Sequence, residues 1–193
     1  MSAPCGVVVA DIGGTHARFA LARIGDGRAP SLSAITKLRV ADYATLASAF
    51  GAFRDQCPAP FPSDAALAVA TTVRGGTREE EIAFPNSPWT LKPAALLSDL
   101  GIDRLTLLND FGAGAHAVDR ADANELTHLG GPKAGLPEAG VITVMGPGTG
   151  LGVAFIARGS GGSTVYETEA SHIAFAPYDD VEDRILHRFR QLY

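Results

Sequence analysis

Short apolar runs alternate with amphipathic stretches along this chain of 193 residues. Residues 7–10 form a β-branched run and residues 17–22 form a second apolar run, with a glycine pair between them. This pattern predicts two neighbouring strands joined by a tight turn. Further apolar runs predict strands at 31–40, 65–70, 81–84, 105–108, 141–145 and 151–157.

Other segments carry helical periodicity. Apolar residues recur three or four positions apart at 42–55 and again at 181–192, as they do on one face of a helix. We expect a third helix to begin at a cap formed by Thr90 and to end at Gly101. A helix rich in glycine and alanine is expected near 112–121. The alternation of strands and helices favours an α/β architecture over an all-β one.

Composition and charge narrow the class of protein. The length is sufficient for one good core or two small ones, and a turn-rich connector at 130–140 marks a shift in composition. The formal net charge is -5 and no run of lysine or arginine occurs, which argues against nucleic acid as a partner. Cys5 and Cys57 have neither metal-site nor disulfide-framework spacing. No apolar run approaches membrane-spanning length, so we expect a cytoplasmic location without membrane contact.

Asp11 lies at the end of the first predicted strand, directly before the turn I-G-G-T. The turn can present backbone N–H groups to phosphate oxygens, and Thr15 can add a hydroxyl. Asp11 itself is suited to hold Mg²⁺ through the water shell of the ion, because a carboxylate and a phosphate repel each other. The alternative is a glycine hairpin with an incidental aspartate.

A second glycine-rich turn lies between the predicted strands at 141–145 and 151–157. In M-G-P-G-T-G-L-G, residues Gly146, Gly148, Gly150 and Gly152 alternate around Thr149. Two such turns, each between strands and each with a threonine, are better explained by one bound polyphosphate than by chance.

Asn109 and Asp110 follow the predicted strand L-T-L-L. A carboxylate at the carboxyl end of a strand points into the crevice where α/β proteins bind ligands. Asp110 can there accept the proton of an attacking hydroxyl, and Asn109 can donate and accept hydrogen bonds to a polyol. The alternative is that Asp110 is the N-cap of the following helix.

The segment E-T-E-A-S-H places Glu169 three residues before His172. A carboxylate and an imidazole together can bind two sugar hydroxyls, whereas zinc is disfavoured because no cysteine cluster accompanies them. A structural histidine is the alternative. Asn86 and Trp89 offer an amide and an aromatic ring as a weaker sugar-side pair, although the tryptophan is equally explained as a core residue.

The order of the motifs D-I-G-G-T-x-x-R, L-N-D-F, G-P-G-T-G-L-G and E-x-x-H resembles that of bacterial glucokinases of the hexokinase–actin–Hsp70 superfamily. The resemblance runs from about residue 6 to the end of the chain. It implies an α/β fold of the ribonuclease-H-like, actin-like ATPase type, with a central mixed sheet. It divides the chain into a small domain at 1–110 and the first part of a large, incomplete domain at 111–193.

The resemblance also implies roles for individual residues. Asp110 corresponds to the catalytic base, and Asp11 would hold Mg²⁺ through water. Glucose would be bound by Asn86, Asn109, Asp110, Glu169 and His172. The phosphates of ATP would be bound by Ala10, Asp11, Ile12, Gly13, Gly14, Thr15, Arg18, Gly146, Gly148, Thr149 and Gly150.

The activity implied is the ATP-dependent phosphorylation of D-glucose to glucose 6-phosphate for glycolysis, with D-glucose and Mg-ATP as partners and a homodimer as one possible assembly. His16 stands where the family more often has asparagine. The family also runs on for well over a hundred further residues, so the chain resembles an N-terminal fragment that we expect to be weak or inactive alone. The alternatives are a non-catalytic sugar-binding fragment or sensor of the same fold, and a kinase for another hexose.

Overall fold

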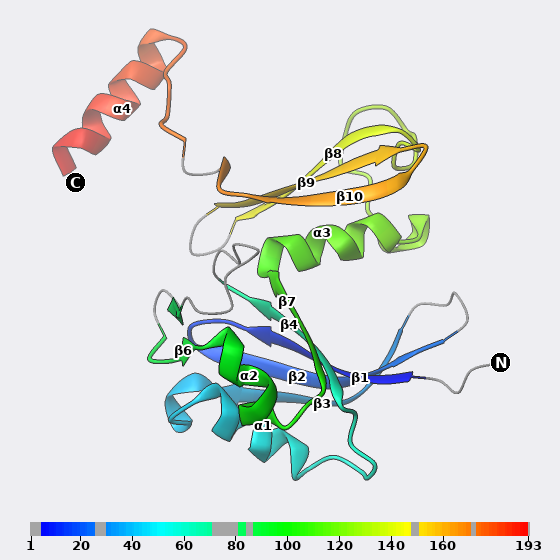
Figure 1. Cartoon of the computed structure of the whole chain (residues 1–193). Helices are drawn as coiled ribbons and strands as arrows, with labels where there is room; N and C mark the ends of the chain where they lie inside the picture. Colours follow the sequence, from blue (N-terminus) through cyan, green and yellow to red (C-terminus); the bar gives the residue numbers. More distant parts are fainter. Residues whose placement is uncertain are drawn as a thin grey trace.

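A five-stranded mixed sheet forms the first half of the protein (Figure 1). The computed structural model describes residues 5–25, 30–70, 81–83, 87–147, 151–170 and 173–192. The strands of this sheet lie in the order β3-β2-β1-β4-β7. Strand β2 is antiparallel to both β1 and β3, whereas β4 is parallel to β1 and β7 is parallel to β4. Their bounds are β1 Cys5–Ile12, β2 His16–Ile24, β3 Ser31–Arg39, β4 Asp64–Val69 and β7 Arg104–Asn109.

This order confirms the α/β prediction and is the ribonuclease-H-like arrangement that the resemblance implies. Helices α1 (Leu46–Arg54) and α2 (Pro93–Leu100) lie on one face of the sheet (Figure 1). The core between helices and sheet is aromatic: the ring of Phe19 in β2 stacks on that of Phe53 in α1, with centroids 5.3 Å apart. The opposite face of the sheet is therefore the one that carries the polar residues of β2.

The two helices begin later than the sequence predicts. Helix α1 starts at Leu46 after a capping box between Thr45 and Ser48, because Val40–Asp42 form a separate 3-10 turn, η1. The expected cap at Thr90 is wrong. Thr90 pairs instead in a short hairpin of β5 (Ile82–Ala83) and β6 (Thr90–Leu91), and α2 begins at Pro93 after Lys92. The expected end at Gly101 is confirmed, with φ of 61° in the left-handed region.

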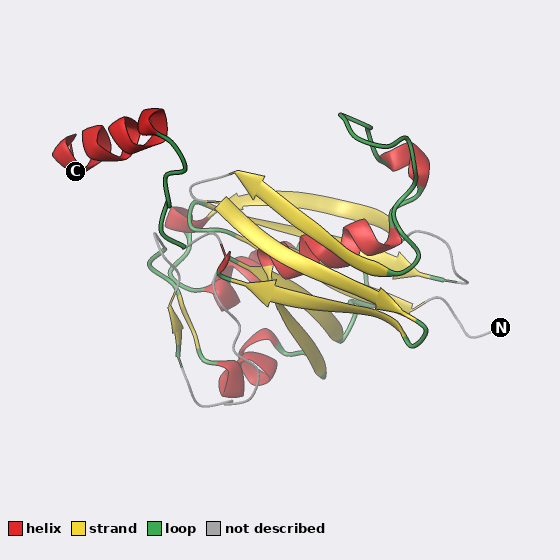
Figure 2. Ribbon diagram, turned by 90° about the horizontal axis from the view of Figure 1, so that it is seen from above, coloured by secondary structure: helices red, strands yellow, loops and turns green. Residues whose placement is uncertain are grey.

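The second half is a three-stranded antiparallel sheet covered on one face by helix α3 (Asp110–Arg120), as Figure 2 shows from above. Its strands lie in the order β10-β9-β8, and a 3-10 turn, η2 (Ala123–Glu125), follows α3. Their bounds are β8 Gly140–Pro147, β9 Leu151–Gly159 and β10 Gly162–Thr168. Strand β10 was not predicted, because its sequence G-S-T-V-Y-E-T has no apolar run and lies at a half-exposed sheet edge.

Arg158 of β9 anchors this sheet to α3. Its Nε donates to Asp119 Oδ1 at 2.8 Å, and its Nη2 donates to the carbonyl of Asp119 at 2.9 Å. Both side chains are largely buried, with 17% of Arg158 and 8% of Asp119 exposed. The hydrogen bond from Arg158 accordingly holds the pKa of the Asp119 carboxyl below its usual value.

The predicted terminal helix is confirmed as α4 (Asp180–Leu192), which lies apart from both sheets in Figures 1 and 2. Within the described residues of α4 no side chain is buried, and its apolar face is exposed at Val181, Ile185, Phe189 and Leu192. None of the described helices is both long and apolar enough to cross a membrane.

Candidate active site

The junction of β7 and α3 brings two predicted site residues together without an intervening loop. Asn109 is the last residue of β7 and Asp110 is the first residue of α3. Asn109 Oδ1 accepts hydrogen bonds from the backbone N–H groups of Phe111 and Gly112, at 2.9 and 3.2 Å. Asn109 is therefore the N-cap, and the alternative prediction that Asp110 caps this helix is wrong.

Asp110 is half-buried at this junction, and its environment favours the protonated carboxyl. Burial raises the pKa of Asp110, and the negative charges of Asp11 and Glu169 raise it further. The hydrogen bond from the N–H of Phe111 to Asp110 Oδ1, at 2.8 Å, acts in the opposite direction and does not cancel the rise. A carboxylate with a raised pKa is a stronger proton acceptor, which suits a general base.

The first glycine turn connects β1 to β2 and is closed by a hydrogen bond from the N–H of Gly13 to the carbonyl of His16, at 3.0 Å. Asp11 lies opposite Arg18 across the two strands, and Arg18 Nη1 donates to Asp11 Oδ2 at 2.6 Å. Both side chains remain about half exposed. The ion pair orients Asp11 and leaves its carboxylate accessible.

The other residues of this turn differ in what they can offer a ligand. Gly14 is half-buried and Thr15 is exposed. The side chains of Ala10 and Ile12 are only 8% and 0% exposed and pack in the core. A phosphate role for these two residues is thus limited to their backbone.

Basic residues surround this turn. His16 pairs with Arg39, and Arg18 pairs with Lys37, across β2 and β3, so the four side chains share one face of the sheet. The pKa of His16 is lowered by burial and then by the positive charges of Lys37, Arg18 and Arg39. The sequence analysis did not identify Lys37 and Arg39. Their position beside His16 and Arg18 follows from the pairing of β2 with β3, which a linear pattern does not show. The positive charge on this face suits an anionic ligand.

The second glycine turn has a packing requirement that the sequence did not reveal. Gly146 of β8 and Gly152 of β9 are paired, and the ring of Phe111 lies against both. A Cβ on Gly152 would lie 1.8 Å from Phe111 Cε2, and one on Gly146 would lie 3.2 Å from Phe111 Cε1. These two glycines make room for the aromatic ring of α3. Gly148, Thr149 and Gly150 lie outside the described residues.

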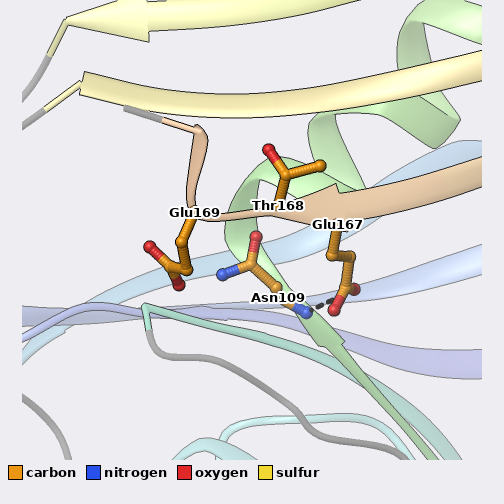
Figure 3. Close-up of a pocket in the computed structure, with 4 residues that line it drawn as sticks. All are labelled: Asn109, Glu167, Thr168 and Glu169. Atoms are coloured by element: carbon orange, nitrogen blue, oxygen red, sulfur yellow. Dashed lines mark hydrogen bonds between the residues drawn. The ribbon is translucent and has the colours of Figure 1, made fainter. Parts of the chain in front are cut away.

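Asn109 and Glu169 line a small pocket together with Glu167 and Thr168 (Figure 3). The side-chain nitrogen of Asn109 points toward Glu169 in this view, while its oxygen points the other way. Hydroxyl groups are suitable ligands for such a pair, because the amide donates hydrogen bonds and the carboxylate accepts them. Asn86 and His172 lie outside the described residues.

Trp89 is not an exposed platform for a sugar. Its ring is 2% exposed, and its Nε1 donates to the carbonyl of Tyr43 at 2.9 Å. The core interpretation of this tryptophan is therefore confirmed.

Glu167 is the residue at this site that the sequence analysis missed. Its Oε1 accepts a hydrogen bond from the backbone N–H of Asn109 at 2.9 Å. The signal available was the spacing E-T-E, because in extended chain residues two apart project to the same side, here Glu167 and Glu169.

The side chains around the glycine turn differ from those of an all-protein metal site. Among the described residues no three His, Cys, Asp or Glu side chains are grouped so as to hold one. A half-exposed single carboxylate such as Asp11 nevertheless fits Mg²⁺, which usually keeps several waters and is bound by one or two carboxylates together with substrate phosphates.

A mixed sheet of this order, with a half-buried carboxylate at a strand-to-helix junction, is typical of the actin-like α/β fold. The family model for glucokinase matches residues 8–193, and the chain belongs to the glucokinase family.

Individual relatives agree with this assignment. A glucokinase of Zymomonas mobilis is 47% identical over 187 residues, which are 97% of this chain and 56% of that protein. The crystal structure of a glucokinase from an Antarctic psychrotroph has a TM-score of 0.80 at 30% identity, over 97% of this chain and 57% of that one. A glucokinase from Balamuthia mandrillaris, solved in complex with glucose, has a TM-score of 0.72 at 25% identity, over 97% and 54% of the two chains. The chain thus spans about half the length of these relatives.

Proposed function

We propose that the protein to which this chain belongs transfers a phosphoryl group from ATP to the 6-hydroxyl of D-glucose. The single observation that carries the proposal is the half-buried Asp110, whose raised pKa reflects burial and two nearby carboxylates, next to the pocket of Asn109 and Glu169. Membership of the glucokinase family supports the reaction. The glucose complex of the Balamuthia mandrillaris structure supports the sugar.

The sugar would bind at the β7–α3 junction. The amide of Asn109 would donate to one hydroxyl and the carboxylate of Glu169 would accept from another, with Asn86 and His172 as further proposed ligands. Asp110 would orient the 6-hydroxyl and take its proton as the oxygen bonds to the γ-phosphorus. The bond from that phosphorus to the β–γ bridging oxygen breaks in the same displacement, and ADP leaves.

The nucleotide phosphates would bind at the two glycine turns. The backbone N–H of Gly14, the Thr15 hydroxyl and the Arg18 guanidinium are proposed as donors at the first turn, whose backbone is shaped by Ala10, Ile12 and Gly13. Gly146, Gly148, Thr149 and Gly150 are proposed for the second. Mg²⁺ bound with Asp11 through water would neutralise charge on the transferring phosphoryl group. Arg18 would hold Asp11 in place through the ion pair described above.

The remaining expectations are proposals about the whole protein. We propose domain limits of 1–110 and 111–193, with closure of the two domains excluding water, which otherwise competes as the phosphoryl acceptor. We also propose a cytoplasmic location and a homodimer, which fractionation and light scattering of the complete gene product would test.

The decisive test is the substitution Asp110→Ala in the complete gene product. We expect glucose 6-phosphate formation, followed by a coupled assay, to fall by about 10²–10⁴-fold, because a positioned general base contributes on that scale. The matched control is Asp99→Ala on the exposed surface of α2, which should retain the wild-type rate.

Retention of more than about a tenth of the wild-type rate by Asp110→Ala contradicts the role of base. A wild-type protein that binds glucose in a titration and forms no product favours the alternative, a sugar-binding protein of the same fold. A faster reaction with another hexose than with glucose favours the second alternative, a kinase for that other hexose.

A further inference from the structure

Glu167 makes a contact that the proposed reaction does not use. It lies near the end of β10, and its Oε1 accepts the backbone N–H of Asn109 at 2.9 Å (Figure 3). The two residues are 58 positions apart in the chain. Asn109 belongs to β7, which is the last strand of the first sheet, and no described strand pairs with its outer edge. The carboxylate of Glu167 therefore accepts the backbone hydrogen bond that a neighbouring strand would otherwise accept.

The first turn of α3 is shaped to admit this side chain. A Cβ on Gly112 would lie 2.3 Å from Glu167 Oε1 and 2.6 Å from Glu167 Cγ, so a residue with a side chain would displace the glutamate. A carboxylate at this position also lies where the helix dipole favours negative charge. The glycine of L-N-D-F-G, Gly112, thus leaves room for the side chain of Glu167 beside the first turn of α3.

The contact fixes Asn109 at both of its ends. Glu167 holds the backbone N–H, and the N–H groups of Phe111 and Gly112 hold the side-chain oxygen. The amide nitrogen is consequently directed toward Glu169, as Figure 3 shows. Because Glu167 and Glu169 lie on one short segment, the same hydrogen bond also sets the position of Glu169 relative to Asn109.

We propose that Glu167 is a positioning residue for sugar binding: it holds the Asn109–Asp110 junction against the segment that carries Glu169. It acts through Asn109 and does not contact the substrate. The inference rests on the proposed function for its kinetic consequence. Its structural consequence, protection of the Asn109 amide, can be measured whether or not the protein is a kinase.

The experiment compares Glu167→Ala with Glu167→Gln, whose amide oxygen can still accept the N–H of Asn109. We expect Glu167→Ala to lower kcat/KM for glucose about 10- to 100-fold, as loss of a hydrogen bond to a charged group does, and to leave KM for ATP unchanged. The variant Glu167→Gln should retain most of the wild-type kcat/KM for glucose. The matched control is Glu138→Ala, which removes an exposed glutamate from the connector before β8.

Amide hydrogen exchange supplies the readout that does not depend on activity. In the wild-type protein and in Glu167→Gln, the N–H of Asn109 should exchange slowly, and in Glu167→Ala it should exchange fast while the amides of β1 keep their protection.

Fast exchange of Asn109 in the wild type, or a Glu167→Ala variant with unchanged kcat/KM for glucose, overturns the proposal. So does a variant in which KM for ATP rises as much as KM for glucose, because that result indicates general loss of structure. A wild-type protein without kinase activity contradicts the proposed function instead, and the exchange data together with glucose titration of the variants then decide the role of Glu167.

Discussion

The environment of Asp110 raises its pKa, which suits a general base but lowers the stability of the fold. Its folded-state pKa is raised by burial and by two carboxylates, so the unfolded chain loses this proton at a lower pH than the folded chain does. Between the two pKa values the folded state holds more protons, and the free energy of unfolding therefore falls as pH rises. Above the pKa of the carboxyl in the unfolded chain, the environment of Asp110 therefore lowers the stability of the fold.

The substitution Asp110→Asn should consequently make the protein more stable at neutral pH, although it removes the proposed base. We expect the denaturant midpoint of Asp110→Asn to exceed that of the wild type at pH 7. The difference should vanish at a pH below the unfolded-state value of about 3.9, where both side chains are neutral. Asp99→Asn on the exposed surface of α2 is the control. A midpoint for Asp110→Asn at or below that of the wild type at pH 7 contradicts the sign of the pKa shift.

At the residue scale the sequence predicted the position of Asp110 after a strand and missed the contact between Asn109 and Glu167. The position of Asp110 at the end of a strand is visible in L-T-L-L-N-D, because a strand and the polar residues that follow it are local features. The hydrogen bond from Asn109 to Glu167 joins residues 58 positions apart and depends on how β10 lies beside β7. No local pattern contains that information.

The ring of Phe111 packs helix α3 against strands β8 and β9, in addition to the contact between Arg158 and Asp119. Phe111 lies against the paired Gly146 and Gly152, and these glycines lack the side chains that would exclude it. Substitution Gly152→Ala should destabilise the protein by about 1–3 kcal/mol, as overpacking typically does. Chemical denaturation of the variant measures this cost.

Gly159→Ala is the matched control, because Gly159 lies on the same strand and a Cβ there would meet nothing within 4 Å. In a Phe111→Ala background the cost of Gly152→Ala should largely disappear, since the ring that opposes the new methyl group is gone. Equal costs in the two backgrounds would show that the glycine serves the turn and not the ring.

At the element scale, a clear apolar pattern was sufficient to predict an element, and the edge strand β10, which lacks one, was not predicted. The helix at 181–192 and the strands at 65–70 and 105–108 were predicted within a residue or two, because each has a continuous apolar pattern. Strand β10 was not predicted because most of its residues are exposed and its conformation depends on pairing with β9. The Thr90 cap was wrong because pairing with β5 competes for that residue.

At the scale of the whole molecule, the described residues form two apolar clusters of unequal size. The first joins β1, β2 and β4 to α1 and α2, and it includes the fully buried Phe19, Phe53 and Leu67. The buried residues of the second cluster are Ala115, Ala154 and Ile156. Large apolar side chains are also exposed on the second sheet and on α4, among them Val141, Met145, Leu151, Tyr166, Ile185 and Phe189.

The 193-residue chain by itself should therefore show unequal local stability. We expect amides of β1 and β4 to exchange more slowly than those of β8 and β10 by several orders of magnitude. We also expect the chain to bind the dye ANS at neutral pH, because exposed apolar side chains of this kind bind such dyes. Uniform protection across both sheets, or a lack of dye binding, would contradict this description.

The direct passage from β7 into α3 has a mechanical consequence. Within the described residues the chain crosses from the first sheet to the second sheet once, at Asn109–Asp110. A body that turns about an axis moves least at the axis, and a covalent crossing without a loop constrains the axis to pass close by. Any rotation of one half against the other thus carries the glycine turn at Asp11 through an arc while Asp110 stays nearly still. In the proposed function the sugar would therefore bind close to the pivot.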